Sequence, residues 1–187
     1  IRTTLGAMAL AALAATGLGF ADSVEGTVML KGTPPPNKPN KLGSDKKCEA
    51  LCKGKKHETE DYVVNGNKLA NVLVYLKDAK KGGTKPAKAT LNQVGCKYVP
   101  HVIGLMSGQE LEIRNSDPLM HNINTTQAKI NPVFNIPQPN KGMSEVRKFP
   151  KAEMPPIKVK CNVHKWMTSY LGVFDHPYFA VTDKDGK

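Results

Sequence analysis

The sequence predicts an all-β sandwich preceded by an N-terminal extension, and three observations lead to this prediction. From about residue 89 onward, short runs rich in β-branched and aromatic residues recur at a spacing of roughly ten residues. Gly, Pro and Asn separate these runs, and no amphipathic helical period follows residue 21. Because such spacing without helices is typical of two packed sheets, we expect an antiparallel β-sandwich. The 187 residues suffice for one domain with a buried core.

Residues 1–21 are predicted to form a signal peptide. The run Leu5 to Phe20 is small and apolar, follows Arg2, and ends at Gly19-Phe20-Ala21, which satisfies the small-x-small rule for cleavage. A membrane helix needs about 20 apolar residues, so this shorter run favours cleavage over retention as a span. We therefore expect an exported protein, periplasmic or secreted, that begins near Asp22 and keeps no membrane span.

Residues 22–90 are expected to hold the N-terminal extension and the first strands. The alternating run Ser23 to Leu30 predicts a strand, and the Lys-rich stretch up to Glu60 predicts an irregular loop or short helix. The dipeptide Asn65-Gly66 is a strong hairpin signal, with Val72 to Leu76 as the returning strand. Residues Lys77 to Lys88 are predicted to be an exposed basic loop.

Residues 91–183 are expected to form the core domain. Its strands are predicted at Thr90 to Val94, Tyr98 to Leu105, Glu110 to Asn115, Glu145 to Phe149, Ile157 to Cys161, Thr168 to Phe174 and Tyr178 to Thr182. Both ends of the chain are interpreted as truncated, because it starts with Ile and closes on a turn-like string. We expect residues 184–187 to begin a C-terminal region that is missing.

The chain is strongly basic, with a formal charge of +11 that falls to +10 when Arg2 leaves with the signal peptide. Such an excess favours acidic partners. Export argues against nucleic acid, and no nucleic-acid-binding signature accompanies the scattered lysines. Two interpretations stay open: a solvated basic surface, or steering toward an acidic redox partner.

Four cysteines in an exported chain would normally form two disulfides. If Cys161 binds a metal, one bridge remains, and it should join Cys96 to Cys48 or to Cys52, because Cys48 and Cys52 are too close in sequence for good geometry. Cys48, Cys52 and His57 could instead share a second metal site, but three ligands at this spacing match no standard zinc pattern.

A cluster of metal-ligand residue types follows the strand-like run at 157–160. Cys161, His164 and Met167 lie within seven residues, and His121 is the candidate for a further ligand upstream. A thiolate, two imidazoles and a weak thioether suit both Cu(I) and Cu(II). We expect Cys161 to make the short bond, His121 and His164 to complete the plane, and Met167 to be the weak axial ligand of one copper ion.

The run Cys161-Asn-Val-His164-Lys-Trp-Met167 resembles the ligand loop of the cupredoxins, the blue copper proteins, with a spacing similar to that of amicyanin and shorter than that of plastocyanin. The longer stretch from Gln93 to Val181 is similar to bacterial exported cupredoxin-domain proteins. The resemblance implies a Greek-key sandwich and gives Asn122 the role of holding the cysteine loop by a hydrogen bond. Val163 and Lys165 stand where amicyanin-type loops carry prolines.

The predicted function is a periplasmic electron carrier that passes single electrons between redox proteins such as a cytochrome or an oxidoreductase. The electron is expected to cross the exposed edge of His164, with Lys165 and Trp166 as the partner surface. An enzyme is not expected, since no catalytic triad or His-x-His pair occurs. His101 and His176 are expected to be structural. The alternatives are a copper-handling protein without electron transfer and a metal-free structural module with Cys161 in a disulfide.

Overall fold

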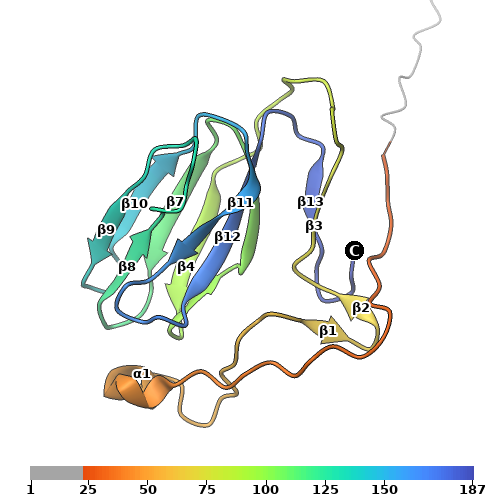
Figure 1. The fold of residues 1–187 in the computed structure, drawn as a ribbon. Coiled ribbons are helices and arrows are strands. Elements are labelled where there is room, and N and C mark those ends of the chain that lie inside the picture. The colour runs from red at the N-terminus through yellow and green to blue at the C-terminus, as the bar shows by residue number, and fades with distance from the viewer. Residues whose placement is uncertain (1–22) are drawn as a thin grey trace, which may run out of the picture.

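The structure is a computed structural model that describes residues 23–187, so the predicted signal peptide at 1–21 lies outside it. The described chain is built mainly of strands (Figure 1). Its helical parts are the 3₁₀ turn η1 (Leu42–Ser44) and the helix α1 (Lys46–Leu51). No helix within residues 23–187 is long and apolar enough to cross a membrane.

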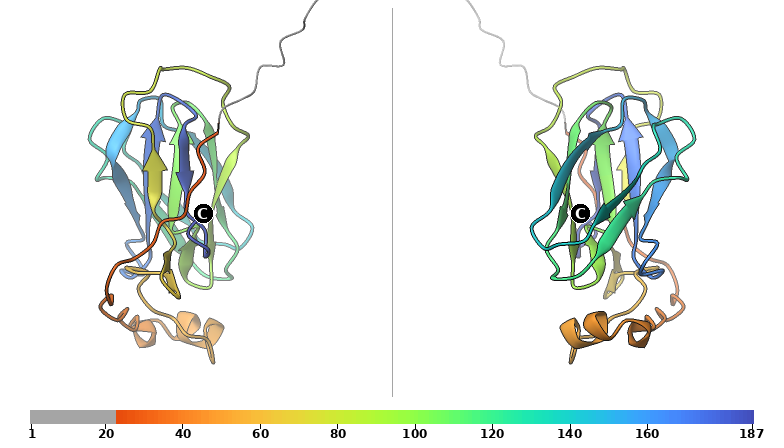
Figure 2. Two further views of the ribbon diagram at one scale, coloured as in Figure 1. Left: turned by 90° about the vertical axis from the view of Figure 1, so that its right-hand side faces the viewer. Right: turned by 90° about the vertical axis from the view of Figure 1, so that its left-hand side faces the viewer.

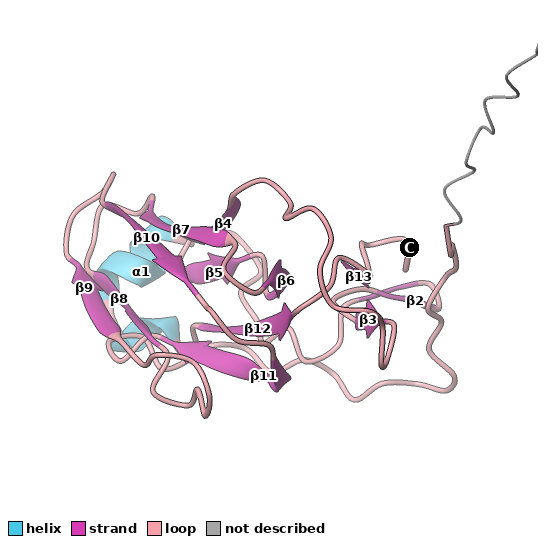
Figure 3. Ribbon diagram, turned by 90° about the horizontal axis from the view of Figure 1, so that it is seen from above, coloured by secondary structure: helices cyan, strands magenta, loops and turns pink. Residues whose placement is uncertain are grey.

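Two sheets form the sandwich. One has the strand order β10-β7-β4-β5 and consists of β4 (Ala89–Val94), β5 (Lys97–Val99), β7 (Glu110–Asn115) and β10 (Ser144–Lys148). The other has the order β6-β12-β11-β8-β9 and consists of β6 (Val102–Met106), β8 (His121–Asn124), β9 (Asn135–Gln138), β11 (Glu153–Lys160) and β12 (Thr168–Phe174). Seen from above, the sheets form two facing layers (Figure 3). The predicted all-β sandwich is confirmed.

The core lies between these layers because the strands alternate in the period of two that a half-buried sheet requires. In β7, Leu111 and Ile113 are fully buried, whereas Glu112 between them is only partly buried and Arg114 after them is exposed. In β11 and β12, Val159 and Leu171 are likewise fully buried. These apolar side chains belong to one continuous core cluster, which also contains Cys161 and the disulfide-bonded Cys48 of the N-terminal segment.

The expectation of purely antiparallel pairing was wrong. The pairs β4–β7 and β6–β12 are parallel. The chain moves from one sheet to the other between β5 and β6 and back again at β7, so strands of the same direction become neighbours. For the same reason the predicted strand Tyr98 to Leu105 is two strands in different sheets, separated at Pro100, which has no N–H for the ladder.

Strands β8 and β9 were missed in the sequence. Their residues, His121-Asn-Ile-Asn124 and Asn135-Ile-Pro-Gln138, are mostly polar, so they lack the apolar alternation by which strands are recognised. All four residues of β8 are nevertheless buried. Buried polar side chains need hydrogen-bond partners, and those of His121, Asn122 and Asn124 find them in other side chains.

In the N-terminal segment, two strand predictions need correction. The run Ser23 to Leu30 is not a strand and makes only an isolated bridge between Met29 and Lys68. The hairpin at Gly66 is present, but it joins β1 (Val64–Asn65) to β2 (Lys68–Leu69). The expected returning strand is β3 (Leu73–Tyr75), which pairs instead with β13 (Phe179–Val181).

The packing of β3 and β13 on the sandwich explains why β3 pairs with β13 rather than with the hairpin strands β1 and β2. The side chains of Leu73 and Phe179 lie over Gly172 and Gly104, where an added Cβ would come within 2.3 and 2.5 Å of them. Glycine at these two positions therefore permits the close approach of the small sheet. Helix α1 lies at the opposite end of the sandwich from the 77–88 loop, as Figures 1 and 2 show.

Candidate metal centre

Three metal-donor side chains meet at the end of the sandwich near α1. His121 is the first residue of β8, Cys161 directly follows β11, and His164 lies in the loop that leads to β12. Their donor atoms all lie within 4.8 Å of one another, and no more than 2% of any of the three residues is exposed. The tertiary structure thus brings together the three strongest ligand candidates of the sequence.

The distances between these donors fit a common ion. The Nδ1 atoms of His121 and His164 are 3.0 Å apart, and the Sγ atom of Cys161 is 3.8 Å from Nδ1 of His164. Donors on one ion with bonds of about 2.0–2.3 Å lie no more than about 4.6 Å apart. Both separations satisfy that limit, and a thiolate with two imidazoles is the donor set that suits copper.

Met167 lies in the same loop as two of these donors and is 1% exposed. The loop is closed by two backbone hydrogen bonds, from the Met167 N–H to the His164 carbonyl at 2.9 Å and from the Cys161 N–H to the Met167 carbonyl at 3.2 Å. The loop is therefore held rigidly without the prolines of the amicyanin type. An axial role for Met167 stays a prediction.

Asn122 connects the two segments that carry the donors. Its Oδ1 atom accepts a hydrogen bond from the backbone N–H of Asn162 at 2.7 Å and lies 3.3 Å from Sγ of Cys161. Its carbonyl accepts a short hydrogen bond from the Tyr98 hydroxyl. These contacts place Asn122 where the cupredoxin resemblance expects it, bridging β8 and the cysteine loop.

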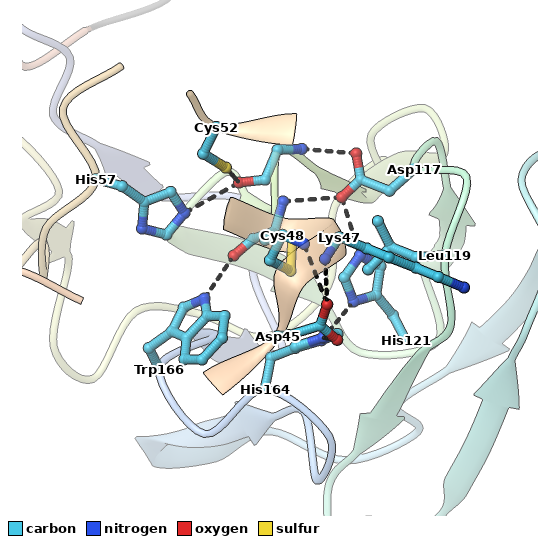
Figure 4. Close-up of a disulfide and its surroundings, with 12 residues drawn as sticks. Asp45, Lys47, Cys48, Cys52, His57, Asp117, Leu119, His121, His164 and Trp166 are labelled. Carbon is cyan, nitrogen blue, oxygen red and sulfur yellow. Dashed lines mark hydrogen bonds and ion pairs between the residues drawn. A yellow bond between two sulfur atoms is a disulfide. The ribbon is translucent and has the colours of Figure 1, made fainter. Parts of the chain in front are cut away.

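Two carboxylates that sequence reasoning missed contact the outer nitrogens of the imidazoles. Asp117 Oδ2 lies 2.9 Å from Nε2 of His121, and Asp45 Oδ2 lies 3.0 Å from Nε2 of His164 (Figure 4). A carboxylate on the outer nitrogen fixes the tautomer and the ring orientation of a ligand histidine. The contact of Asp117 with His121 could have been recognised in the sequence, because the two residues are only four positions apart. Asp45, in contrast, is separated from His164 by 119 residues.

Asp117 also anchors the turn between β4 and β5. Its two oxygens accept hydrogen bonds from the N–H groups of Gly95 and Cys96 at 2.7 and 2.8 Å. Both turn residues have positive φ, 61° and 53°, which is uncommon for a non-glycine residue such as Cys96. The carboxylate and the disulfide together hold this conformation.

The electrostatics of the cluster favour a thiolate. Burial opposes ionisation of Cys161, but hydrogen bonds from His121 and His164 outweigh it and lower the thiol pKa to about 6. Burial likewise lowers the pKa of the two histidines, but Cys161 and the carboxylates Asp117 and Asp45 more than compensate and raise each pKa. The thiolate is the metal-binding form of cysteine, whereas each histidine binds a metal only as the neutral imidazole.

The expected exposed edge of His164 is not found. Only 1% of this residue is exposed, because the N-terminal segment with Asp45 covers it. Lys165 is exposed and Trp166 is half-buried, so both remain accessible. The Trp166 ring lies 5.2 Å from the His164 ring, centroid to centroid, and its Nε1 donates to the Cys96 carbonyl at 3.0 Å.

The structure contains the disulfide Cys48–Cys96, one of the two pairings expected for Cys96, while Cys52 and Cys161 are free and buried. Cys161 is thus not half of a bridge. Since Cys48 is in the disulfide, it does not share a metal site with Cys52 and His57. His101 lies 3.5 Å from Glu60, and His176 stacks beside Tyr178, so neither joins the donor group.

Comparisons with known proteins identify no relative in sequence: no family model matches, and no curated protein matches. Among solved structures, the chain is similar to a Cu-containing nitrite reductase from Thermus scotoductus SA-01 (18% identity, TM-score 0.44), over 63% of this chain and only 26% of the reductase. It is also similar to a mutant of amicyanin in the Cu(I) form (15% identity, TM-score 0.42), over 46% of this chain and 82% of that one.

A third similar structure is a purple cupredoxin from Nitrosopumilus maritimus, with 22% identity and a TM-score of 0.38, over 47% of this chain and 99% of that one. The chain is similar to cupredoxins in fold, and the function proposed for it rests on its own buried His121, Cys161 and His164.

Proposed function

We propose that this protein is an exported, periplasmic or secreted blue-copper protein that carries single electrons on one copper ion. The single observation that carries the proposal is the buried group of three donors, with the His121 and His164 Nδ1 atoms facing each other beside the Cys161 sulfur. Met167 is proposed as the weak axial ligand. Residues 91–183 are proposed as the copper-binding core and 22–90 as its extension.

The residues of the chain would perform three tasks at this site. Cys161, His121 and His164 would hold a copper ion, which would supply one-electron chemistry between Cu(I) and Cu(II). Burial of all three donors excludes water from them. Asp117 and Asp45 orient the imidazoles, and Asn122 fixes the position of the cysteine loop against β8. These contacts would keep rearrangement of the donors during electron transfer small.

Because His164 is buried, the electron needs a route other than an exposed edge of this histidine. Trp166 packs on the His164 ring and lines a surface cleft of about 1010 Å³ together with Lys165. We propose these two residues as the contact surface for a redox partner, a cytochrome or an oxidoreductase with an acidic docking face. The positive charge of the chain supports this choice, because complementary charge raises the rate of encounter.

Metal analysis with a visible spectrum of the purified protein tests the proposal. We expect one copper per chain, intense colour in the oxidised form, and repeated reversible reduction at an electrode. Copper that is bound but released to an apo acceptor without reversible reduction would indicate a copper-handling protein instead. Absence of copper binding would leave a structural sandwich and refute the electron carrier.

A further inference from the structure

The contact between Asp45 and His164 crosses from the N-terminal segment to the metal-binding loop. Asp45 uses its two carboxylate oxygens for different purposes. Oδ1 accepts hydrogen bonds from the N–H groups of Lys47 at 2.8 Å and Cys48 at 3.2 Å, which makes Asp45 the N-cap of α1. Oδ2 meets Nε2 of His164 at 3.0 Å. One side chain therefore begins the helix and contacts the candidate ligand.

The segment that carries Asp45 is held in place covalently. The residue three positions later, Cys48, is bonded to Cys96 in the turn between β4 and β5. That turn is itself fixed by Asp117 and accepts the Trp166 hydrogen bond. Figure 4 shows Asp45, Cys48 and His164 gathered at α1. Because the segment is anchored to the sandwich through both the disulfide and the Asp45 contact, α1 is a fixed cover and not a loosely attached one.

We propose that Leu42 to Cys52 form a covalently tethered cap over the metal centre, in which Asp45 is the positioning residue for His164. The carboxylate holds the imidazole with Nδ1 turned toward His121 and Cys161, and the cap closes the outer edge of His164 to water and to small ligands. The assignment of Nδ1 to copper rests on the proposed function, whereas the covering of His164 does not.

The size of the effect follows from the role. Removing the carboxylate partner of a ligand histidine typically weakens metal affinity about 10–100-fold. Asp45 is reached by some solvent, with 30% of its side chain exposed, so its contribution should lie toward the lower end of that range. This loss of metal affinity should arise because the His164 imidazole rotates freely and water enters the site. The set of donor atoms should stay the same.

Three variants separate positioning from helix capping and from charge. Asp45→Ser keeps an N-cap oxygen, a role in which Ser is as good as Asp, but is too short to reach His164. Asp45→Ala removes both contacts. Glu49→Gln removes one negative charge from the same helix and is the matched control, because Glu49 pairs with the exposed Lys46 and not with the metal centre. Mapping the Cys48–Cys96 bridge in each variant shows whether the cap is still tethered.

The first measurement is made on metal-free protein by hydroxyl-radical footprinting, which reports exposure of the side chain. We expect His164 to be labelled at background level in the wild type and in Glu49→Gln, and several-fold more in Asp45→Ser and Asp45→Ala. Tyr178, which is 53% exposed and bonded through its carbonyl to the N–H of Leu76, is the internal reference and should be labelled equally in all four proteins.

The second measurement is competition of each copper-loaded protein with a chelator. Asp45→Ser should bind copper about 10-fold more weakly than the wild type and accept azide as an added ligand, while Glu49→Gln should differ by less than about 2-fold. If His164 stays protected and copper affinity is unchanged in Asp45→Ser and Asp45→Ala, the cap is refuted while the copper site stands. If no protein binds copper but the footprint changes as expected, the electron carrier is refuted and the cap stands.

Discussion

Asn122 and Cys161 are 39 residues apart in the chain, yet the amide oxygen of the first lies 3.3 Å from the sulfur of the second. The same oxygen accepts a hydrogen bond from the backbone N–H of Asn162. Strands β8 and β11 are also paired through Lys160 and Asn124. The two donor segments are therefore held together both by this pairing in the sheet and by the Asn122 side chain.

Cys161→Ser should abolish the colour of the oxidised protein, because the strong absorption of a blue-copper site comes from the copper–thiolate bond. A visible spectrum and metal analysis measure this. Cys52→Ser is the control, since Cys52 is also a buried free thiol but lies outside the donor group. A Cys161→Ser protein that keeps both copper and colour would show that another residue supplies the thiolate.

Met167→Gln should retain copper and lower the reduction potential, because the axial thioether contact in these sites is long and weak and tunes the potential rather than holding the ion. Voltammetry and metal analysis of the variant test this. Complete loss of copper would mean that Met167 is a primary ligand or that the closed loop between Cys161 and Met167 has opened.

Peptide mapping of the oxidised protein should recover the Cys48–Cys96 disulfide and free thiols at Cys52 and Cys161. The double variant with Cys48→Ser and Cys96→Ser should lose about 2–4 kcal/mol of stability, because the bridge closes a long loop. Denaturant unfolding measures the loss. Recovery of Cys161 in a disulfide of copper-loaded protein would contradict both the bridge and the metal centre.

Glu153 gives the stability of the fold a pH dependence remote from the donor group. Burial opposes its ionisation, but hydrogen bonds from the backbone of Lys129, Ile130 and Asn131 and from the Asn131 side chain outweigh burial and lower the pKa of the carboxyl. A depressed folded pKa adds stability above the unfolded pKa, and this stability is lost as the pH falls through the folded pKa.

Glu153→Gln should therefore destabilise the protein by about 1–3 kcal/mol at pH 7, because the N–H groups that now bond to the carboxylate would lose one of its two acceptor oxygens. The difference from the wild type should shrink as the pH falls below the ordinary glutamate pKa of about 4.3 and through the lower pKa of the folded state, where the wild-type carboxyl becomes neutral. Urea unfolding at about pH 7 and about pH 3 provides the comparison. A constant difference at both values would show that the charge of Glu153 contributes nothing.

Lys165→Glu should lower the second-order electron-transfer rate with an acidic redox partner at low ionic strength, while colour and potential stay nearly unchanged. The reason is that charge near the contact surface steers encounter, and salt screens this steering. Lys80→Glu is the matched control, an exposed lysine in the loop at the opposite end of the sandwich from α1 (Figure 1). A rate indifferent to salt and to Lys165 would exclude docking at this face.

The predictions for the fold succeeded where the local pattern and the tertiary environment agree. Glu110 to Asn115 and Thr168 to Phe174 were given the bounds that the structure shows, because their patterns are strand-like and they border on turns. The run at 23–30 alternates too, but it found no continuous partner in a sheet. Alternation shows that a segment is able to form a strand, and only a neighbouring strand supplies the hydrogen bonds.

What the sequence determined by itself is the set of chemical groups: one thiolate and two imidazoles at recognisable spacings, the asparagine beside the first histidine, and the class of fold that holds them. Each of these depends on residue types close together in the chain. The tertiary structure decided which cysteine pairs with Cys96, that Asp45 contacts His164, and that His164 is covered. Those contacts join segments up to 119 residues apart. Their formation depends on how the N-terminal segment packs against the finished sandwich, which no local pattern encodes.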